Sequence, residues 1–554
     1  MCILGRLLYV QVINGENLQK KAIDQWTREI PIVAARGKIV DENGVVLADN
    51  DDTYTVFARK SAIKDPEKTS KILSEALGSD YDYVYSRLTE TKASEVTVKK
   101  QVPKEKIDLL LGENLAGVYF SRDNSRKYPY GEFLTAVLGF TSTDGKGQSG
   151  LELYYDKYLS GINGEILYET DIVGVEVDGG KASYVPATDG LNVKLTIDYE
   201  IQQLCEAAMS EALEIHSAKA ASMLVLDPQN GKIKALCVKP SYDLNDVPRD
   251  DLTLLNALSR NTLFCDIYEP GSTFKIITAA ANIEEKRRGN PKAFSSSHVF
   301  NSSRYRFIDG QRVKCWSNHA NGKHSALNLQ GALNNSCNPI FVDIAMSLGK
   351  ETMYDYIDRF NFGKATGVDF GGEAQGMLLP ESSVVNVDLA RISFGQTVAV
   401  TGLQLAAATA AAVNGGKYYK PYLVEEIYDK NGTLAEKIYP EVKNEAISEG
   451  ASKELALMLE QVVKEGSGRQ AYIEGYRVGG KTGTAQKYQN GVIASGKYVA
   501  SFVGFFPANA PRYLALVVID EPVGSYYGST VAAPYAKSVF EGIINLKNIK
   551  PEGD

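Results

Sequence analysis

The spacing of hydrophobic residues changes near residue 192, where a regular alternation begins. The segment NVKLTIDYEIQQLCEAAMSEALEI first alternates apolar and polar residues and then repeats apolar residues at spacings of three and four. This pattern predicts a strand followed by an amphipathic helix. The next segment, ASMLVLDPQNGKIKALCV, has two apolar runs around the turn residues 228–231 and predicts a pair of strands.

Helical spacing recurs through the second half of the chain, at residues 272–286, 328–348, 350–360, 401–413 and 452–465. Two strand-like runs, YVASFVGFF and YLALVVID, follow, and APYAKSVFEGIINL predicts a closing helix. Strands at both ends with helices between them predict one α/β domain whose sheet is built from both of its termini. We place this domain at residues 192–548 and treat residues 549–554 as a tail.

The earlier residues predict a separate and smaller module. RGKIVDENGVVLADN holds two β-branched runs around the turn Glu42–Gly44, which is a strong hairpin signal. Residues 14–30 have the spacing of a polar amphipathic helix, and residues 60–115 carry charged helical patterns. We place this module at residues 28–191.

The first residues, MCILGRLLYVQVI, are apolar but are interrupted by Arg6. A membrane-spanning helix needs about 20 apolar residues, so this stretch cannot cross a membrane alone. It also lacks the small-residue cleavage site of a signal peptide. A core strand and an interfacial helix are alternatives, but we interpret residues 1–27 as a residual membrane-proximal helix, the last turns of a span that begins upstream.

Composition and charge narrow the function classes. The 554 residues can hold more than one domain, and a net charge of −8 argues against a nucleic-acid partner. Six cysteines are too few for a disulfide scaffold, and the four histidines lack a metal-binding spacing such as HExxH. We therefore expect neither a metal ion nor an organic cofactor.

The segment EPGSTFK, residues 269–275, places a nucleophile beside a base. Pro270 and Gly271 interrupt the chain, so a helix can begin at Ser272, where free backbone N–H groups and the helix dipole favour negative charge. Lys275 follows on the same helix face. Burial or a nearby positive charge would lower its pKa and make it a base for the serine hydroxyl. Taken alone, an N-cap serine and an exposed lysine are the simpler explanation of this common spacing.

Two further motifs change that balance. NNSCNPIF contains the Ser-x-Asn triplet Ser336–Asn338, and VGGKTGTAQ contains the Lys-Thr-Gly-Thr string Lys481–Thr484. Ser-x-x-Lys, then Ser-x-Asn, then Lys-Thr-Gly, in this order, is the motif set of serine β-lactamases and penicillin-binding proteins. The three motifs together favour a catalytic serine.

On these motifs the chain resembles the class B penicillin-binding proteins, the monofunctional peptidoglycan D,D-transpeptidases of the division and sporulation type. The resemblance extends over nearly the whole chain, through RGKIVDENGVVLA, SRKYPYGEFLTAVLGF, GQSGLELYYDKYLSGINGE, YEPGSTFKIITAAANIEE, FGQTVAVTGLQLAAATAAAVNGG and YYGSTVAAP. It implies a transpeptidase domain with a central antiparallel sheet flanked by helices. It also implies an elongated N-terminal α+β pedestal or dimerisation module.

The resemblance implies a role for each residue of the first two motifs. Ser272 would attack the carbonyl between the last two D-alanines of a stem peptide, and Lys275 would take its proton. Ser336 would relay a proton to the leaving D-alanine. Asn338 would bond the substrate amide or Lys275. The resulting acyl-enzyme would pass to an amine of a neighbouring stem peptide and form a cross-link.

The third motif would bind the substrate. Lys481 would keep the site positive, and Thr482 and Thr484 would bind the terminal carboxylate, with Gly483 between them. The backbone N–H groups of Ser272 and Thr484 would form the oxyanion hole. β-Lactam antibiotics, which mimic the D-Ala-D-Ala end, would trap the nucleophile.

The resemblance also implies partners and a location. A membrane glycan polymerase and division or sporulation proteins would be the protein partners, at the division septum or the spore cell wall. A single-pass anchor upstream would hold the catalytic domain outside the cytoplasm.

Other functions fit parts of the pattern. A β-lactamase or a penicillin-sensing protein would share the acylation machinery, and a non-catalytic cell-wall scaffold would keep the fold without the chemistry. Cys337 with His319 or His324 would suit a thiol protease, but no local signature supports it. DGKGQSGLE has the GxGxxG spacing of a dinucleotide site, but no second βαβ pattern follows it.

Two cysteines form a candidate redox pair. Cys315 precedes Trp316, and Cys337 lies inside the Ser-x-Asn motif. Outside the cytoplasm they would meet an oxidising environment, and a disulfide between them would distort the site and make activity depend on a thiol reductant. Two inert buried thiols are the simpler alternative.

Overall fold

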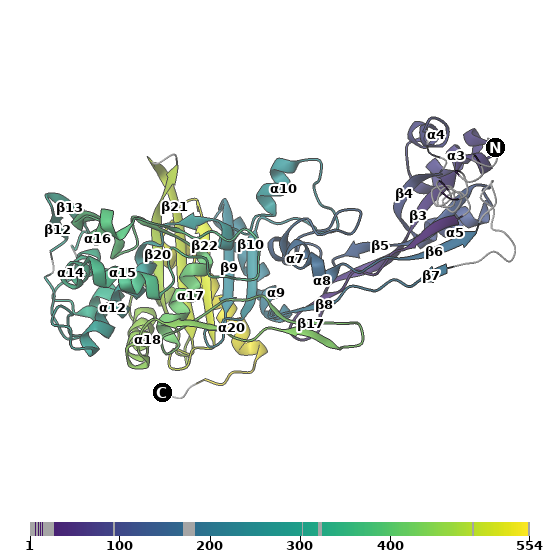
Figure 1. Cartoon of the computed structure of the whole chain (residues 1–554). Coiled ribbons are helices and arrows are strands. Elements are labelled where there is room, and N and C mark those ends of the chain that lie inside the picture. The colour runs from purple at the N-terminus through teal and green to yellow at the C-terminus, as the bar shows by residue number, and fades with distance from the viewer. Residues whose placement is uncertain are drawn as a thin grey trace.

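Two modules lie end to end in an elongated molecule (Figure 1). The computed structural model describes residues 27–169 and 183–551 apart from 92, 94, 302, 320–323 and 490–491, and it also describes residues 6, 9, 12 and 14. The second half of the chain forms the broad end, which holds the large central sheet, and the first part forms the narrower end. The mixed α+β architecture expected from the sequence is confirmed.

The central sheet is antiparallel and five-stranded, in the order β10-β9-β22-β21-β20. Its strands come from both ends of the larger module: β9 (Ala220–Leu226), β10 (Ile233–Lys239), β20 (Gly479–Gln489), β21 (Val492–Phe506) and β22 (Tyr513–Asp520). The two ends pair directly, because Ala221 of β9 lies opposite Ile519 of β22. The prediction of a sheet built from both termini is confirmed, and β20 is an edge strand.

Successive residues of the central strands face two different hydrophobic cores. Five helices cover the sheet: α9 (Tyr199–Ile215), α12 (Lys275–Arg287), α17 (Gly402–Val413), α18 (Glu449–Lys464) and α20 (Ala533–Leu546). In β9, Met223 and Val225 pack into the core shared with α9 and α20, whereas Leu224 and Leu226 pack into the core shared with α12, α17 and α18. Because side chains alternate across a strand, burial of both faces explains why the run MLVL, residues 223–226, is apolar without a break.

The predicted helix over residues 328–348 is two helices in the structure, α13 (Leu329–Asn334) and α14 (Asn338–Leu348). Ser336, between them, has a φ of 51°, in the left-handed region that interrupts a right-handed helix. Cys337 is the N-cap residue of α14, and Pro339 lies in the first turn. The chain therefore turns sharply at the Ser-x-Asn motif.

The narrower module is built on the long strand β3 (Val46–Arg59). β3 forms the predicted hairpin with β2 (Ile39–Val40) and pairs on its two sides with β4 (Glu95–Pro103) and β5 (Val118–Lys127). Its helices are α3 (Pro66–Leu77), α4 (Tyr81–Thr89), α5 (Lys104–Gly112), α6 (Thr135–Leu138), α7 (Gly150–Tyr154) and α8 (Asp156–Leu159). The hairpin prediction is confirmed, whereas the helical pattern over residues 60–115 missed β4.

The predicted helix over residues 14–30 is wrong where the structure can test it. Thr27–Ile32 forms strand β1, which pairs with β6 (Gly164–Glu169), and β6 pairs in turn with β7 (Ser183–Val185). Most of the expected membrane-proximal helix at residues 1–27 lies outside the described residues. Within the described part of the chain, none of the helices has the length and the apolar character needed to cross a membrane.

A shared sheet joins the two modules. β2 pairs in parallel with β8 (Asn192–Leu195), and β8 pairs with β17 (Val424–Tyr428), which belongs to the larger module. The order is β18-β17-β8-β2-β3-β4, with β5 on β3. The expected boundary at residues 191 and 192 therefore falls within hydrogen-bonded structure.

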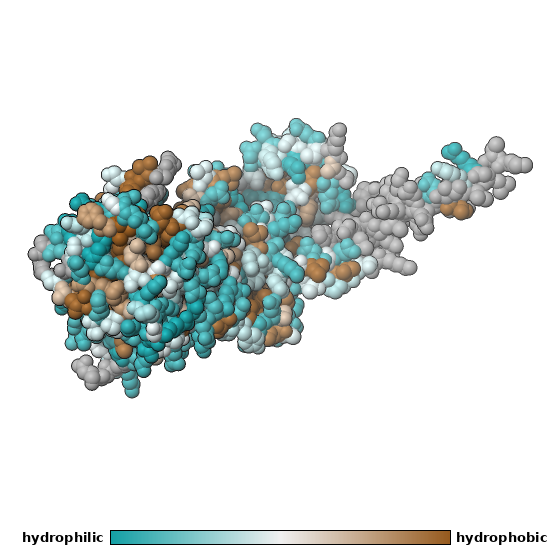
Figure 2. Space-filling view, turned by 60° about the vertical axis from the view of Figure 1, so that its left-hand side comes forward, coloured by the Kyte–Doolittle hydropathy of each residue, from teal (hydrophilic) through white to brown (hydrophobic). Residues whose placement is uncertain are grey.

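The remaining elements are short: α10 (Leu252–Leu258), α11 (Thr262–Cys265), β11 (Ile267–Tyr268), the 3-10 turn η3 (Gly271–Phe274), β12 (Tyr305–Ile308), β13 (Gln311–Lys314), α15 (Lys350–Arg359), β14 (Met377–Leu378), α16 (Asn386–Ile392), β15 (Val398–Thr401), β16 (Lys417–Tyr419), β18 (Leu434–Lys437), β19 (Val442–Glu445) and α19 (Gly528–Val531). On the face turned to the viewer in Figure 2, hydrophilic side chains predominate and apolar ones form separate patches.

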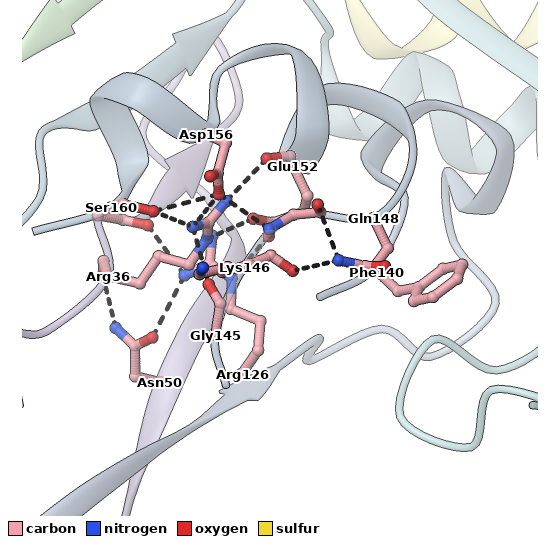
Figure 3. A network of polar contacts seen from close by, with 12 residues as sticks. Arg36, Asn50, Arg126, Phe140, Gly145, Lys146, Gln148, Glu152, Asp156 and Ser160 are labelled. Atoms are coloured by element: carbon pink, nitrogen blue, oxygen red, sulfur yellow. Dashed lines mark hydrogen bonds and ion pairs between the residues drawn. The ribbon is translucent and has the colours of Figure 1, made fainter. Parts of the chain in front are cut away.

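A buried ion-pair network ties the narrower module together (Figure 3). Glu152 is fully buried, and its two carboxylate oxygens accept from Arg36 Nε and Arg126 Nε, both at 2.6 Å. Arg36 also donates to Asp156 Oδ1 at 2.7 Å and to Ser160 Oγ at 2.9 Å. One carboxylate thus joins the chain before β2 to the end of β5 through α7.

Replacing Glu152 by Ala should destabilise this module, because two buried guanidinium groups would lose their shared carboxylate. Breaking a buried pair of this kind typically costs about 3–5 kcal/mol in the free energy of unfolding. Asp52→Ala is the matched control, since its exposed carboxylate lies 3.6 Å from Arg122, and we expect a change under about 1 kcal/mol there. Denaturant-induced unfolding measures both. Equal midpoints for Glu152→Ala and the unaltered chain would contradict the role given to this network.

Candidate active site

Three segments that are far apart in the sequence meet around one amine. Lys275 Nζ lies 3.1 Å from Ser272 Oγ, 3.0 Å from Ser336 Oγ and 2.6 Å from Asn338 Oδ1. Lys481 Nζ lies 3.0 Å from the same Ser336 Oγ, across 145 positions of chain. All five candidate catalytic residues therefore belong to one hydrogen-bonded cluster.

The turn before α12 presents Ser272. Gly271 has a φ of 56°, and its N–H donates to Gly395 O at 3.0 Å. A side chain at Gly395 would place its Cβ 2.1 Å from Gly271 O, so this approach requires a glycine. The segment η3 is a 3-10 turn, and α12 proper begins at Lys275. The predicted helix start at Ser272 is therefore the tighter first turn of a longer helix.

The edge strand β20 lies against η3. A Cβ on Gly483 would lie 2.9 Å from Pro270 O and 2.4 Å from Ser501 Oγ, so the strand and the turn touch through bare backbone. Lys481 and Thr482 are both buried, although neighbouring residues of a strand point to opposite faces. From one face of this edge strand, Lys481 Nζ reaches Ser336 Oγ. Thr484 Oγ1 accepts from the N–H of Gly528 in α19 at 3.2 Å.

Burial controls the charge of the two lysines. Lys275 is completely buried, and desolvation lowers its pKa to about 8. Lys481 is also completely buried, and desolvation, followed by the charge of Lys275, lowers its pKa well below the usual value. Among the described residues, neither amine forms an ion pair with a carboxylate. The neutral form of Lys275 is therefore accessible near neutral pH.

The contacts of Lys275 match those of a neutral amine. Ser336 O at 2.7 Å and Asn338 Oδ1 at 2.6 Å can only accept hydrogen bonds. A neutral amine gives its two N–H groups to these acceptors and keeps its lone pair for the proton of one of the two nearby hydroxyls, Ser336 at 3.0 Å or Ser272 at 3.1 Å. The Ser272 hydroxyl, at 3.1 Å, is in position to supply that proton. The arrangement can deprotonate a serine for attack on an acyl group.

The two candidate redox cysteines lie beside this cluster, together with two histidines. The donor atoms of Cys315, His319, His324 and Cys337 all lie within 4.8 Å of one another. Both cysteines are free thiols in this structure, so their disulfide stays a prediction. The hydrogen bond between the thiols lowers the pKa of Cys315 and raises the pKa of Cys337.

Sequence reasoning weighed His319 and His324 only as partners of Cys337 in a thiol protease and missed them as metal ligands. The signal was available in the spacing Cys-x3-His-x4-His over residues 315–324, because His-x3–5-His is a known spacing of metal ligands. The fourth member, Cys337, lies 13 positions further on and is brought back by the turn before α14.

The GxGxxG segment does not form a nucleotide site. A Cβ at Gly147 would lie 2.0 Å from Glu152 O, and one at Gly150 would lie 2.5 Å from Val137 O. Arg36 Nη1 donates to Gly145 O at 3.0 Å. Gly147 and Gly150 are therefore packed against backbone, and Gly145 joins the network of Figure 3 through its carbonyl.

Two family models match the chain. "Penicillin binding protein transpeptidase domain" matches residues 221–541, and "Penicillin-binding Protein dimerisation domain" matches residues 31–195. Together they cover most of the chain, and the first contains all three motifs.

Relatives and solved structures agree with these matches. The chain is 39% identical to stage V sporulation protein D of Bacillus subtilis over 550 residues, which covers 99% of this chain and 83% of that protein. It is 29% identical to the peptidoglycan D,D-transpeptidase FtsI of Escherichia coli K12, over 99% and 90% of the two chains. The fold is similar to that of penicillin-binding protein 3 of Mycobacterium tuberculosis, complexed with aztreonam, with a TM-score of 0.72, 23% identity and coverage of 95% and 98%.

The contact between η3 and β20 predicts that Gly483→Ala destabilises the larger module. The added Cβ would meet Pro270 O at 2.9 Å and force the strand and the turn apart, and overpacking of this kind costs about 1–3 kcal/mol. Gly112→Ala is the control, because nothing lies within 4 Å of its Cβ position at the end of α5. Thermal unfolding should show a lower midpoint for Gly483→Ala alone. An unchanged midpoint would mean that the two segments separate without cost.

Proposed function

This chain belongs to the family of penicillin-binding protein transpeptidases, and we propose that it is a serine D,D-transpeptidase that cross-links peptidoglycan stem peptides. The hydrogen-bonded pair of Ser272 Oγ and the buried Lys275 Nζ, 3.1 Å apart, carries this proposal. A serine with a neutral lysine base is the machinery of acyl transfer.

Acylation begins with the Ser272 hydroxyl. Its oxygen attacks the carbonyl carbon between the last two D-alanines of the donor stem peptide while its proton passes to Lys275. The bond to the last D-alanine then breaks, and its nitrogen needs a proton. Ser336 Oγ lies 3.0 Å from both Lys275 Nζ and Lys481 Nζ, so it can relay a proton from either amine to the leaving group.

β20 and the turn before α12 bind the donor stem peptide and stabilise the negative charge of the tetrahedral intermediate. The backbone N–H groups of Ser272, in η3, and Thr484, in β20, serve as the oxyanion hole. The negative charge of the tetrahedral intermediate develops on the oxygen that they bind, where these two elements meet. Thr482 and Thr484 bind the terminal carboxylate of the donor, and Gly483 allows the close approach. The bound carboxylate favours the charged form of the buried Lys481 amine, which then adds positive charge beside it.

The second half of the reaction returns the enzyme to its starting state. The amine of a neighbouring stem peptide attacks the acyl carbon, Lys275 accepts a proton from this amine, and the Ser272 oxygen leaves with a proton. A β-lactam enters by the same first step, but its opened ring stays attached and blocks the second step.

The cellular setting follows from the substrate. Cross-linking takes place outside the cytoplasmic membrane, so residues 192–548 would act there as the transpeptidase domain, on residues 28–191 as a pedestal. A membrane anchor upstream, a glycan polymerase and division or sporulation proteins are the proposed partners. The similarity to stage V sporulation protein D favours a role in the spore wall over one in the vegetative septum.

Benzylpenicillin should acylate Ser272. Intact mass spectrometry should show one penicilloyl group per chain, and peptide mapping should place it within EPGSTFK. Ser272→Ala should lose the adduct, with a fall of several orders of magnitude in rate. Ser347→Ala is the matched control, because it carries the same Ser-x-x-Lys spacing but its hydroxyl bonds Lys292 O at 2.6 Å.

Nitrocefin separates this enzyme from a β-lactamase. We expect slow, stoichiometric ring opening. Full labelling of Ser272→Ala, or steady turnover of nitrocefin by the unaltered chain, would refute the proposed transpeptidase.

The acylation rate should rise with pH and level off above about 8, the pKa of Lys275. Below this value the amine is protonated and cannot accept a proton, so the rate should fall about tenfold for each pH unit. The groups that face this amine are the hydroxyls of Ser272 and Ser336, Asn338, Lys481 and the nearby thiols. Rates of benzylpenicillin labelling from about pH 6 to 9, with circular dichroism as a folding control, test this profile. A flat profile would exclude Lys275 as the base.

A further inference from the structure

Four side chains with metal-binding donor atoms gather beside the Ser-x-Asn motif. Cys315 follows β13, Cys337 is the N-cap residue of α14, and His319 and His324 lie in the segment between these elements. The two sulfur atoms and one nitrogen from each histidine all lie within 4.8 Å of one another. Three of the four residues are buried, and His319 is partly buried.

The donor set and its dimensions suit zinc. Two thiolates and two imidazoles form a common structural zinc site, with bonds of about 2.3 Å to sulfur and 2.0–2.1 Å to nitrogen. Such bonds in a tetrahedron separate the donor atoms by about 3.3–3.8 Å. The observed separations, all within 4.8 Å, exceed these by about 1.0–1.5 Å at most. Small rotations of the side chains would therefore close the site around one ion.

An independent observation points to a missing ligand. His324 is 5% exposed, and its Nδ1 has no hydrogen-bond partner. A buried polar atom without a partner costs free energy, so such an atom needs an explanation, and a bound ion or water is one. The rings of His324 and His319 are stacked with centroids 4.0 Å apart, and His319 Nε2 lies 4.0 Å from Cys337 Sγ. His324, whose Nδ1 is unsatisfied, thus belongs to the same cluster as the two sulfurs.

A metal explains more of this cluster than the alternatives do. A disulfide between Cys315 and Cys337 would use the two sulfurs and leave two histidines packed together without a function. A thiol protease would use one cysteine and one histidine. A single ion uses all four donors, and soft thiolate with imidazole selects zinc among the common divalent metals.

We propose that Cys315, His319, His324 and Cys337 bind one zinc ion, and that this ion holds the Ser-x-Asn turn against Lys275. Binding releases the thiol protons to solvent and needs no oxidant or reductant. The expectation from the sequence that no metal is bound is thereby revised.

The position of Cys337 connects the ion to the catalytic cluster. Cys337 lies between Ser336 and Asn338, and both neighbours contact Lys275 Nζ, through Ser336 O at 2.7 Å and Asn338 Oδ1 at 2.6 Å. Ser336 has a left-handed φ of 51°, which a free turn would readily give up. A metal bond to the middle residue fixes both contacts at once. This positioning role rests on the proposed transpeptidase function, whereas the metal site itself does not.

Metal content tests the site directly. The full chain, purified under reducing conditions without chelator, should contain about one zinc per chain by mass spectrometry of the metal. Cys315→Ser and His324→Ala should lose at least about tenfold in zinc affinity. Cys265→Ser should keep its zinc, since this half-buried cysteine is not part of the cluster. Replacing zinc by cobalt should give the absorption spectrum of a tetrahedral thiolate site.

Three results would overturn the site: a reduced chain that binds neither zinc nor cobalt, equal zinc in the variants and the unaltered chain, or a Cys315–Cys337 disulfide in the purified protein in place of the metal. The second result would mean an adventitious ion only.

Acylation tests the positioning role on the unaltered chain. Removing zinc with a chelator should slow benzylpenicillin labelling at least about tenfold, because a displacement of about 1 Å in a positioning group can cost about a hundredfold. Returning zinc should restore the rate. Ser272→Ala should bind zinc normally while failing to label, so a failed transpeptidase and a failed metal site give different results. Labelling at an unchanged rate in the zinc-free chain would exclude the positioning role.

Discussion

The proposed chemistry of this molecule depends on one amine that is buried without a counter-charge. Lys275 has no exposed surface and is surrounded by oxygen atoms of Ser272, Ser336 and Asn338 rather than by a carboxylate. A carboxylate at the same distance would hold the ammonium form and remove the base. The fold therefore has to supply hydrogen-bond acceptors without supplying negative charge, and it does so with a backbone carbonyl, an amide and hydroxyls.

Three structural devices bring those acceptors to the amine. The 3-10 turn η3 places Ser272 directly before α12, and Gly271 and Gly395 allow the backbones to touch there. The left-handed backbone of Ser336 interrupts the helix, so that Ser336 O and Asn338 Oδ1 both face Lys275. The edge position of β20 brings Lys481 to the same hydroxyl. Each device is a local departure from regular structure, set within two well-packed cores.

Regular elements could be predicted from the sequence, and departures from regularity could not. The strands β9, β10, β21 and β22 and the long helices follow from apolar spacing, because each is buried along whole faces. The break between α13 and α14 was missed, because the apolar spacing continues across it and only the backbone of Ser336 reverses. β4 was missed because its exposed face carries lysines, which resemble a charged helix in sequence. The motif residues were found through their order along the chain, whereas the cysteine and histidine cluster needed the fold to bring Cys337 back to His319 and His324.

The parallel pairing between β2 and β8 has a mechanical consequence. Backbone hydrogen bonds join residues 35–42 to residues 190–197, among them Gly190 N–H to Ala35 O at 2.9 Å and Glu42 N–H to Ile197 O at 2.9 Å. β8 lies where the narrower end meets the broad end (Figure 1), and β2 pairs with it there. A pulling force along the long axis of the molecule would act across these hydrogen bonds. They would resist it together, in shear, instead of breaking one after another. The junction should therefore be stiff rather than hinge-like. A force on the narrower module would then move the larger module, with its active-site residues, as one rigid body.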